Sequence, residues 1–178
     1  MPYYTRKGDD GYSCLLGKGR VSKNDPVFNA IGAVDELNSS IGVALYYARD
    51  NRVRSALKRI QNDLFIIGAG LASVKVDVPK VKLKANRVVM LEKDIEFMSG
   101  QIPALKRFVI PGGCEAAVHL HMSRAIARRA ERTVVAVSRK RRIDKNLESY
   151  MNRLSSLFFV AAIYLNYIEG IKESHPSY

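Results

Sequence analysis

Cysteine is scarce in this sequence: there are two in 178 residues, Cys14 and Cys114, and they lie far apart. Two thiols this distant do not indicate a disulfide framework, which in small secreted domains needs several closely spaced cysteines. Neither cysteine has a Cys or His neighbour at the spacing of a zinc site. We therefore expect a reduced, cytoplasmic protein that binds no metal through its side chains.

Long apolar runs are also missing. The longest covers residues 157–165 and ends at Asn166, well short of the ~18–20 apolar residues that a membrane-spanning helix needs. The first eight residues contain no apolar segment, so we expect no signal peptide.

Tryptophan is absent, and six Phe and nine Tyr offer few aromatic platforms on which nucleobases could stack. Twelve Gly and six Pro are too few for a collagen-like or low-complexity chain. With 47% hydrophobic and 26% charged residues, the composition is that of a folded globular protein. The length fits one domain over residues 1–178, which we divide into an N-terminal loop at 1–24 and a helical bundle at 25–173.

Acidic residues are outnumbered. The chain has 29 Lys and Arg against 17 Asp and Glu, a formal net charge of +12. Residues 124–142 alone hold eight Lys or Arg and a single Glu. Charge alone is compatible with nucleic acid, an anionic membrane or a phosphorylated small molecule as the partner.

Apolar residues recur at steps of three and four along much of the chain, which is the spacing of one face of a helix. The second such stripe consists of Leu57, Ile60, Leu64, Ile67 and Leu71. Asp25-Pro26 is a helix start, with Asp as the N-cap and Pro at the first helical position. Asp144 is the expected cap of the last helix.

Five helices follow from this pattern, and no credible sheet does. We predict them at about 26–49, 52–73, 84–99, 115–137 and after Asp144, with loops at 1–24 and 104–113. Residues 74–83 alternate apolar and polar, but Pro79 favours a linker over a strand. The predicted fold class is all-α, a five-helix bundle.

The N-terminal loop is rich in glycine and basic residues from Tyr4 to Lys23. Glycines allow close backbone approach, while exposed N–H groups, hydroxyls and Lys or Arg bind phosphate oxygens. The Gly-x-x-x-x-Gly-Lys-[Ser/Thr] pattern of a Walker loop is absent. A phosphate site and a flexible solvated arm both remain open.

Two predicted helices carry polar faces. On the first, Asp35, Asn38, Ser39 and Gly42 share one face at 100° per residue. That face is either exposed surface or a place where another chain or a ligand packs closely.

On the fourth predicted helix, Arg124, Arg128 and Arg132 follow an i, i+4, i+8 line, with Glu131 and His121 on the same flank. Like charges one turn apart repel each other unless an anion or solvent relieves them. Guanidinium forks suit a triphosphate or a carboxylate. The alternative is a solvated helix, or one that faces nucleic acid.

Together these segments resemble the PduO-type ATP:cob(I)alamin adenosyltransferases, also called corrinoid adenosyltransferases. The resemblance covers residues 4–165 and depends on six motifs in the expected order. They are Tyr4-Thr-Arg-Lys-Gly-Asp-Asp-Gly-Tyr-Ser13, Gly19-Arg-Val-Ser-Lys23, Gly32-Ala-Val-Asp-Glu-Leu-Asn-Ser-Ser-Ile-Gly42, Phe108-Val-Ile-Pro-Gly-Gly113, Arg124 through Arg132, and Asn152-Arg-Leu-Ser155.

The resemblance implies a homotrimer of five-helix bundles with active sites between adjacent subunits. It implies that the N-terminal loop and the last two helices hold ATP through Thr5, Arg6, Lys7, Gly8, Ser13, Lys23, Arg128, Arg129, Glu131, Arg132 and Asn152. Asp35 and Arg124 would form a salt bridge across the subunit interface. Phe108 would lie against the corrin and help to displace its lower axial ligand. With Arg128, these three are the catalytic candidates.

The implied reaction is an attack by reduced cobalt(I) on the 5′ carbon of ATP, which yields adenosylcobalamin and triphosphate. It needs no side-chain nucleophile or general base, and the protein positions its substrates and stabilises charge. Mg²⁺ would accompany ATP through phosphate oxygens. A flavoprotein reductase and an adenosylcobalamin-dependent acceptor enzyme are possible partners, whereas nucleic acid and membranes are not expected.

Two other functions remain as alternatives. A nucleic-acid-binding helical protein would use the basic region at 124–142, with strongly salt-dependent affinity, but it explains neither the Gly-Asp-Asp-Gly loop nor Asp35. A corrinoid-binding module without catalysis would not need the phosphate-binding set. The basic turn at 139–142 lies outside the six motifs, and the resemblance gives it no role.

Overall fold

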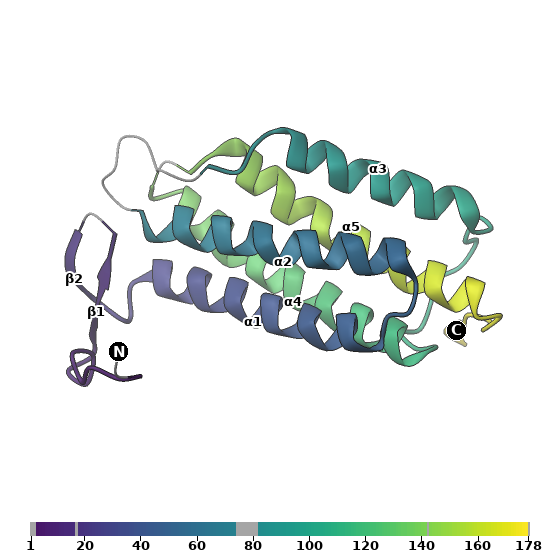
Figure 1. Cartoon of the computed structure of the whole chain (residues 1–178), viewed down its shortest axis with the longest axis horizontal. Helices are drawn as coiled ribbons and strands as arrows, with labels where there is room; N and C mark the ends of the chain where they lie inside the picture. The colour runs from purple at the N-terminus through teal and green to yellow at the C-terminus, as the bar shows by residue number, and fades with distance from the viewer. Residues whose placement is uncertain (1–2, 17, 74–81, 142, 178) are drawn as a thin grey trace.

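The computed structural model describes residues 3–16, 18–73, 82–141 and 143–177, and within them the chain forms a bundle of five helices (Figure 1). The helices are α1 (Pro26–Tyr47), α2 (Asn51–Ala72), α3 (Asn86–Gln101), α4 (Glu115–Ser138) and α5 (Lys145–Ile168). The predicted all-α fold class is therefore confirmed, with helix ends that differ from the predicted ones by one or two residues.

Aspartates begin three of the helices. Asp25 accepts a hydrogen bond from the Val27 amide at 3.0 Å, and Pro26 occupies the first helical position as predicted. Asp144 accepts from the Asn146 amide at 3.0 Å, which confirms it as the cap of α5. Each carboxylate satisfies an amide that has no partner inside its helix, worth about 1 kcal/mol.

The core lies along the helix seams that the apolar stripes predict. The α2 stripe from Leu57 to Leu71 is buried along its length. Helix α4 packs against both α1 and α5, while α3 packs against α5 and α2 against α1. Helix α4 is thereby packed on two sides, so its backbone is a rigid support for the side chains on its remaining surface.

The N-terminal segment is not the irregular loop predicted for residues 1–24. Strands β1 (Tyr12–Leu15) and β2 (Lys18–Ser22) pair antiparallel in a hairpin. Leu15 and Val21 are buried, and the Leu16 amide donates to the Ala72 carbonyl at the end of α2 at 2.9 Å. The frequent glycines hid a short alternating pattern, because Gly is a weak strand former.

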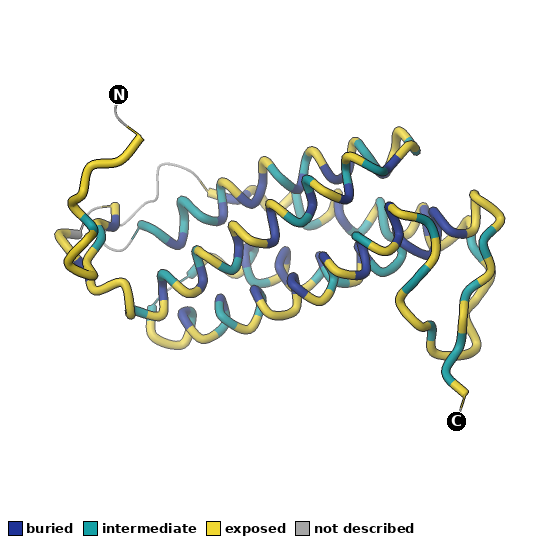
Figure 2. Tube along the Cα trace, turned by 90° about the horizontal axis from the view of Figure 1, so that it is seen from below, coloured by how far each residue is buried: buried dark blue, intermediate teal, exposed yellow. Residues whose placement is uncertain are grey.

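The two irregular regions lie at opposite ends of the bundle. The hairpin stands at one end, and the loop at 102–114 lies with the C-terminal segment at the other (Figures 1 and 2). Most of the predicted linker at 74–83 falls outside the described residues, and Leu83, within them, is buried. No helix among the described residues is both long and apolar enough to cross a membrane.

Candidate functional site

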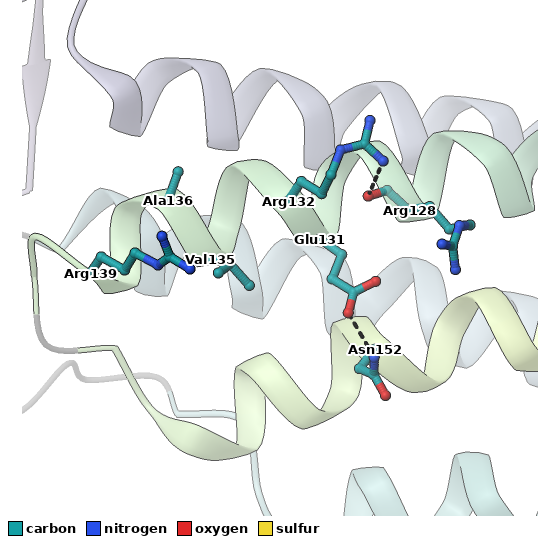
Figure 3. A pocket seen from close by; sticks show the side chains of 7 residues that line it. All are labelled: Arg128, Glu131, Arg132, Val135, Ala136, Arg139 and Asn152. Atoms are coloured by element: carbon teal, nitrogen blue, oxygen red, sulfur yellow. Dashed lines mark hydrogen bonds between the residues drawn. The ribbon is translucent and has the colours of Figure 1, made fainter.

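A pocket of about 490 Å³ lies between α4 and α5 (Figure 3). It is lined by Arg128, Glu131, Arg132, Val135, Ala136, Arg139 and Asn152. Four of these residues belong to the ATP-binding set that the resemblance implies. They come from two consecutive helices, with Glu131 and Asn152 21 residues apart in sequence, and α4–α5 packing brings them together. We call this the cationic pocket.

Hydrogen bonds fix the polar part of the cationic pocket (Figure 3). Asn152 donates from Nδ2 to Glu131 Oε1 at 2.7 Å, and Arg132 donates from Nη1 to the Arg128 carbonyl at 3.2 Å. Arg153, the next residue on α5, donates to Asn152 Oδ1 at 2.8 Å and to Glu92 at 3.0 Å. Asn152 is therefore held by a chain of contacts that ends on α3.

Within the described part of the chain, none of the three arginines that line this pocket forms an ion pair. Glu131 is engaged by the neutral Asn152 and is the one carboxylate among the lining residues. Three positive charges thus meet one negative charge in a partly enclosed space. Guanidinium groups in this arrangement are suited to a polyphosphate.

Arg129 lies on a different side of α4 and does not line the cationic pocket. It pairs with Glu36 on α1, which ties the two helices together. Asp35, the next residue along α1, is exposed and has no ion-pair partner among the residues described. The resemblance implies ATP contact for Arg129, and the structure of the single chain instead gives it an intrachain partner.

We call the N-terminal segment from Tyr4 to Lys23 the arm. It brings together some of the residues that are predicted to bind phosphate. Lys23 donates from Nζ to the Gly8 carbonyl at 2.7 Å, and Arg20 donates to the Lys7 carbonyl at 3.1 Å. A Cβ at Gly8 would lie 3.0 Å from Lys23 Nζ, the flexible end of a side chain that can shift slightly to make room. The hydrogen bond from Arg20 lowers the pKa of Asp10.

The arm does not reach the cationic pocket of its own chain. Thr5, Arg6 and Lys7 are exposed, Ser13 on β1 is half-buried, and none of them lines that pocket. Their backbone and charged groups are open to a partner. The structure thus places the two halves of the predicted ATP site apart within one chain.

A second pocket, of about 400 Å³, opens beside α4 where the 102–114 loop crosses it. Its lining residues are Leu105, Arg107, Phe108, Val109, Pro111, His121, Arg124 and Phe159. Phe108 is 79% exposed, so its ring is largely open to solvent and is not packed in the core. We call this the aromatic pocket, and it contains two of the predicted catalytic residues.

The arginine row of α4 serves both pockets. Arg124 faces the aromatic pocket, whereas Arg128 and Arg132 face the cationic one. Because 3.6 residues make one turn, an i, i+4, i+8 line winds slowly around the helix and does not keep one direction. The nearest α4 residues of the two pockets, Arg124 and Arg128, are thus about one helical turn apart.

His121 is a pocket residue that the sequence does not predict as one. It is 4% exposed, and neither ring nitrogen has a hydrogen-bond partner among the described residues. Burial, and then the nearby Arg124, lower its pKa. The sequence places it only on the same flank of α4 as the arginine row, and no sequence signal separates it from an ordinary core or surface histidine.

Comparisons with known proteins agree with this geometry. The model of the family described as cobalamin adenosyltransferase matches residues 3–165. The chain is 39% identical to a corrinoid adenosyltransferase of Bacillus subtilis (strain 168), over 96% of this chain and 90% of the relative. It is 36% identical to the corrinoid adenosyltransferase MMAB of Homo sapiens, over 96% of this chain and 71% of the relative.

Solved structures of similar chains include bound molecules. A phenylalanine-to-alanine variant of the PduO-type ATP:corrinoid adenosyltransferase from Lactobacillus reuteri, complexed with cobalamin and ATP, superposes with a TM-score of 0.91. It is 36% identical, and the match covers 99% of this chain and 100% of that one. An arginine-to-lysine variant from the same organism, complexed with ATP, gives a TM-score of 0.89 at 37% identity.

Proposed function

The chain belongs to the cobalamin adenosyltransferase family, and from this we infer that it is an ATP:corrinoid adenosyltransferase. It transfers the 5′-deoxyadenosyl group of ATP to the cobalt of a reduced corrinoid. The observation that carries this conclusion is the pair of pockets on α4, one cationic and one aromatic, whose nearest α4 residues are about one turn apart. ATP and corrinoid are also the molecules bound in a similar solved structure.

The cationic pocket binds the phosphates of ATP. Arg128 and Arg132 provide guanidinium groups that form no ion pair among the described residues, and Asn152 fixes the position of the Glu131 carboxylate beside them. Thr5, Arg6, Lys7, Gly8, Ser13 and Lys23 of the arm add backbone amides, hydroxyls and charge. Arg129 contributes indirectly, because its pair with Glu36 holds α4 against α1.

The chemistry requires positioning more than proton transfer. The cobalt(I) electron pair forms the cobalt–carbon bond at C5′, the bond from C5′ to the phosphate oxygen breaks, and triphosphate leaves with that electron pair. Arg128 and Arg132 stabilise the negative charge that develops on the departing oxygen. Preorganised donors of this kind act without reorganisation during the reaction, and no general base is needed.

Phe108 lies against the corrin at the aromatic pocket, where its exposed ring helps to displace the lower axial ligand. Removal of that ligand leaves a four-coordinate cobalt(II) that accepts an electron more readily. Arg124, between the two pockets, pairs with Asp35 of a neighbouring subunit and fixes the corrin relative to ATP. Both side chains are free for this role, since neither forms an ion pair within the described parts of the chain.

A homotrimer completes the site. The arm of one chain stands away from that chain's own cationic pocket, so a neighbouring subunit receives it. An apolar face crosses α1 and α4 at Val43, Tyr46, Val118 and Met122, which are 44%, 81%, 45% and 60% exposed. Burial of such a face in a subunit interface would stabilise the assembly by roughly 25 cal/mol per Å² of apolar surface.

Mg²⁺ accompanies ATP through the phosphate oxygens. The residues that the structure describes contain no group of three or more His, Cys, Asp or Glu side chains placed to hold a metal ion. Mg²⁺ in proteins is commonly held mainly by substrate and water, and this is the arrangement we propose. A flavoprotein reductase supplies the electron that forms cobalt(I), and an adenosylcobalamin-dependent enzyme takes the product.

The direct test is product formation under reduction. Cob(I)alamin, ATP and Mg²⁺ should give the spectrum of adenosylcobalamin and one equivalent of triphosphate. The Arg128→Ala variant should bind corrinoid and form little product. No adenosylcobalamin from the unaltered protein under strictly reducing conditions would contradict the assignment. Salt-sensitive binding to a DNA or RNA duplex in place of turnover would favour the nucleic-acid alternative.

A further inference from the structure

The loop at 102–114, which carries Phe108, is held in place by one buried side-chain amide. Asn166, in the last turn of α5, is 1% exposed. Its Oδ1 accepts from the Cys114 amide at 3.0 Å, and its Nδ2 donates to the Gly112 carbonyl at 3.1 Å. The same Nδ2 donates to Glu173 Oε1 at 2.9 Å. All three hydrogen-bonding sites that Asn166 presents here join the loop to α5 and to the segment that follows it.

Gly113 allows this contact. Its φ angle is +110°, a backbone conformation that side-chain-bearing residues rarely adopt. A Cβ built there would lie 2.0 Å from Asn166 Oδ1, which no real contact permits. Gly113 and Asn166 are therefore fitted to each other, and the fit sets the path of the loop just before α4 begins.

A second set of contacts holds the loop nearer to Phe108. After Gly170, whose φ is +70°, the chain turns back and runs beside the loop (Figures 1 and 2). A ring nitrogen of His175 lies 2.7 Å from the Phe108 carbonyl, and the Ile110 amide donates to the Ser174 carbonyl at 2.8 Å. Because Phe108 is largely exposed, core packing contributes little to its position. We therefore attribute its placement to these contacts, which hold the backbone of the loop.

We propose that Asn166 and the C-terminal segment 171–175 are positioning elements that hold Phe108 in place at the aromatic pocket. The proposal builds on the function inferred above. Neither element lines either pocket, so both act through the loop. If the contacts made by Asn166 and segment 171–175 are lost, Phe108 is still present but displaced, and the four-coordinate corrinoid forms less often. ATP affinity should not change, because the cationic pocket lies on the other side of Arg124.

The expected effect is sizeable. Displacement of a positioned group by about 1 Å can cost on the order of 100-fold in rate. A loosened loop still visits its productive position, so we expect kcat to fall by about tenfold in Asn166→Ala, with an unchanged KM for ATP. The spectral signal of four-coordinate cobalt(II), recorded with ATP present, should fall with kcat.

The experiment compares Asn166→Ala with Ile67→Ala, which opens the core on α2 far from the loop. Both variants lose stability, and only Asn166→Ala should lose the four-coordinate signal. Equal loss in both, or a normal signal in Asn166→Ala, overturns the proposal. If instead the unaltered protein forms neither the signal nor product, the inferred function itself is wrong.

His175→Ala provides a second arm that does not disturb the core, because His175 lies on the outer segment. We expect kcat to fall in this variant too, by a factor several times smaller than in Asn166→Ala, again at constant KM for ATP. His175→Asn keeps an N–H donor near the Phe108 carbonyl and should recover most of the rate. Wild-type kinetics in His175→Ala, together with a normal spectrum, would remove the segment from the proposal even if Asn166→Ala did not fold.

Discussion

Arg128 is an exposed residue whose side chain does nothing visible for its own fold. Its carbonyl accepts from Arg132, but its guanidinium has no ion-pair partner among the described residues. Its removal therefore leaves the helix intact and takes one charge from the pocket. This separation of stability from activity makes it the most informative single substitution in the site.

For Arg128→Ala we expect kcat/KM to fall by about 100- to 1000-fold, the usual cost of losing one preorganised donor in a transition state. The melting temperature should hardly change. Steady-state kinetics and thermal unfolding measure the two quantities, with the exposed Arg49→Ala as a matched control. Full activity in Arg128→Ala would show that the cationic pocket does not serve the leaving triphosphate.

Asp63 is a buried carboxyl, 1% exposed, that accepts from the Tyr150 hydroxyl at 2.8 Å and lies 3.4 Å from Arg87. Burial raises the pKa of Asp63 above its ordinary 3.8 despite these partners. The folded state then binds a proton more tightly than the unfolded state does. Its contribution to stability is complete below the unfolded pKa and is lost as pH rises through the folded one.

Asp63→Asn should remove this dependence. The free energy of unfolding of the unaltered protein should fall relative to that of Asp63→Asn as pH rises from about 4 toward neutrality. Urea titrations at several pH values measure the difference, with Asp9→Asn, on the exposed arm, as the control. Parallel curves for the unaltered protein and Asp63→Asn would mean that the pKa of Asp63 is not raised.

Arg128, Glu131, Arg132 and Asn152 could be assigned from the sequence because they belong to recognisable motifs. The resemblance supplied their grouping, and the helix packing places them around one pocket. Asn166 could not be found this way. Its partners Gly112 and Cys114 lie more than 50 residues away in sequence, and it ends an apolar run that predicts only core packing. Contacts of that range depend on tertiary structure.

Among the elements, the start of α1 and the end of α4 are joined by one side chain. Asp25 uses Oδ1 to cap α1 at the Val27 amide, and its Oδ2 accepts from Arg141 at 2.8 Å. Arg141 belongs to the basic turn at 139–142, for which the sequence motifs gave no role. Arg139 of the same turn lines the cationic pocket, so part of this turn is structural and part faces the site.

Asp25→Ala should lose both contacts and about 1–2 kcal/mol of stability, most of it from the cap. Asp25→Asn keeps an acceptor for the Val27 amide and loses only the charge pair, so its loss should be under about 1 kcal/mol. Urea unfolding of both variants separates the two terms. Equal losses would show that the ion pair, and not the cap, dominates.

Element prediction succeeded where the signal was local. Apolar stripes and Asp caps specify the helices, because each depends on residues within a few turns of one another. The hairpin was missed, since Gly11 and Gly19 break the alternation, and since Leu15 and Val21 become buried only when the arm meets the bundle. The strands are thus decided by a tertiary contact that the local pattern does not contain.

At the scale of the whole molecule, the proposed trimer depends on a charge pair that no single chain contains. Asp35→Arg should weaken assembly or corrinoid use, because it would place two cations together at the interface. The charge swap Asp35→Arg with Arg124→Asp should restore much of the loss. Molar mass by light scattering and kcat for corrinoid turnover provide the readouts. A trimer with unchanged kinetics in Asp35→Arg would remove the pair from the interface.

Both pockets are lined by residues of α4, and this limits which changes in the ATP molecule the enzyme can accept. Arg124 and Arg128 are separated by a rise of about 6 Å along a helix that is packed on two sides. Because helix α4 is rigid, it fixes the distance between Arg124 and Arg128, and neither ligand can change that distance. An ATP analogue with an added methylene between C5′ and the phosphate should bind well and react poorly.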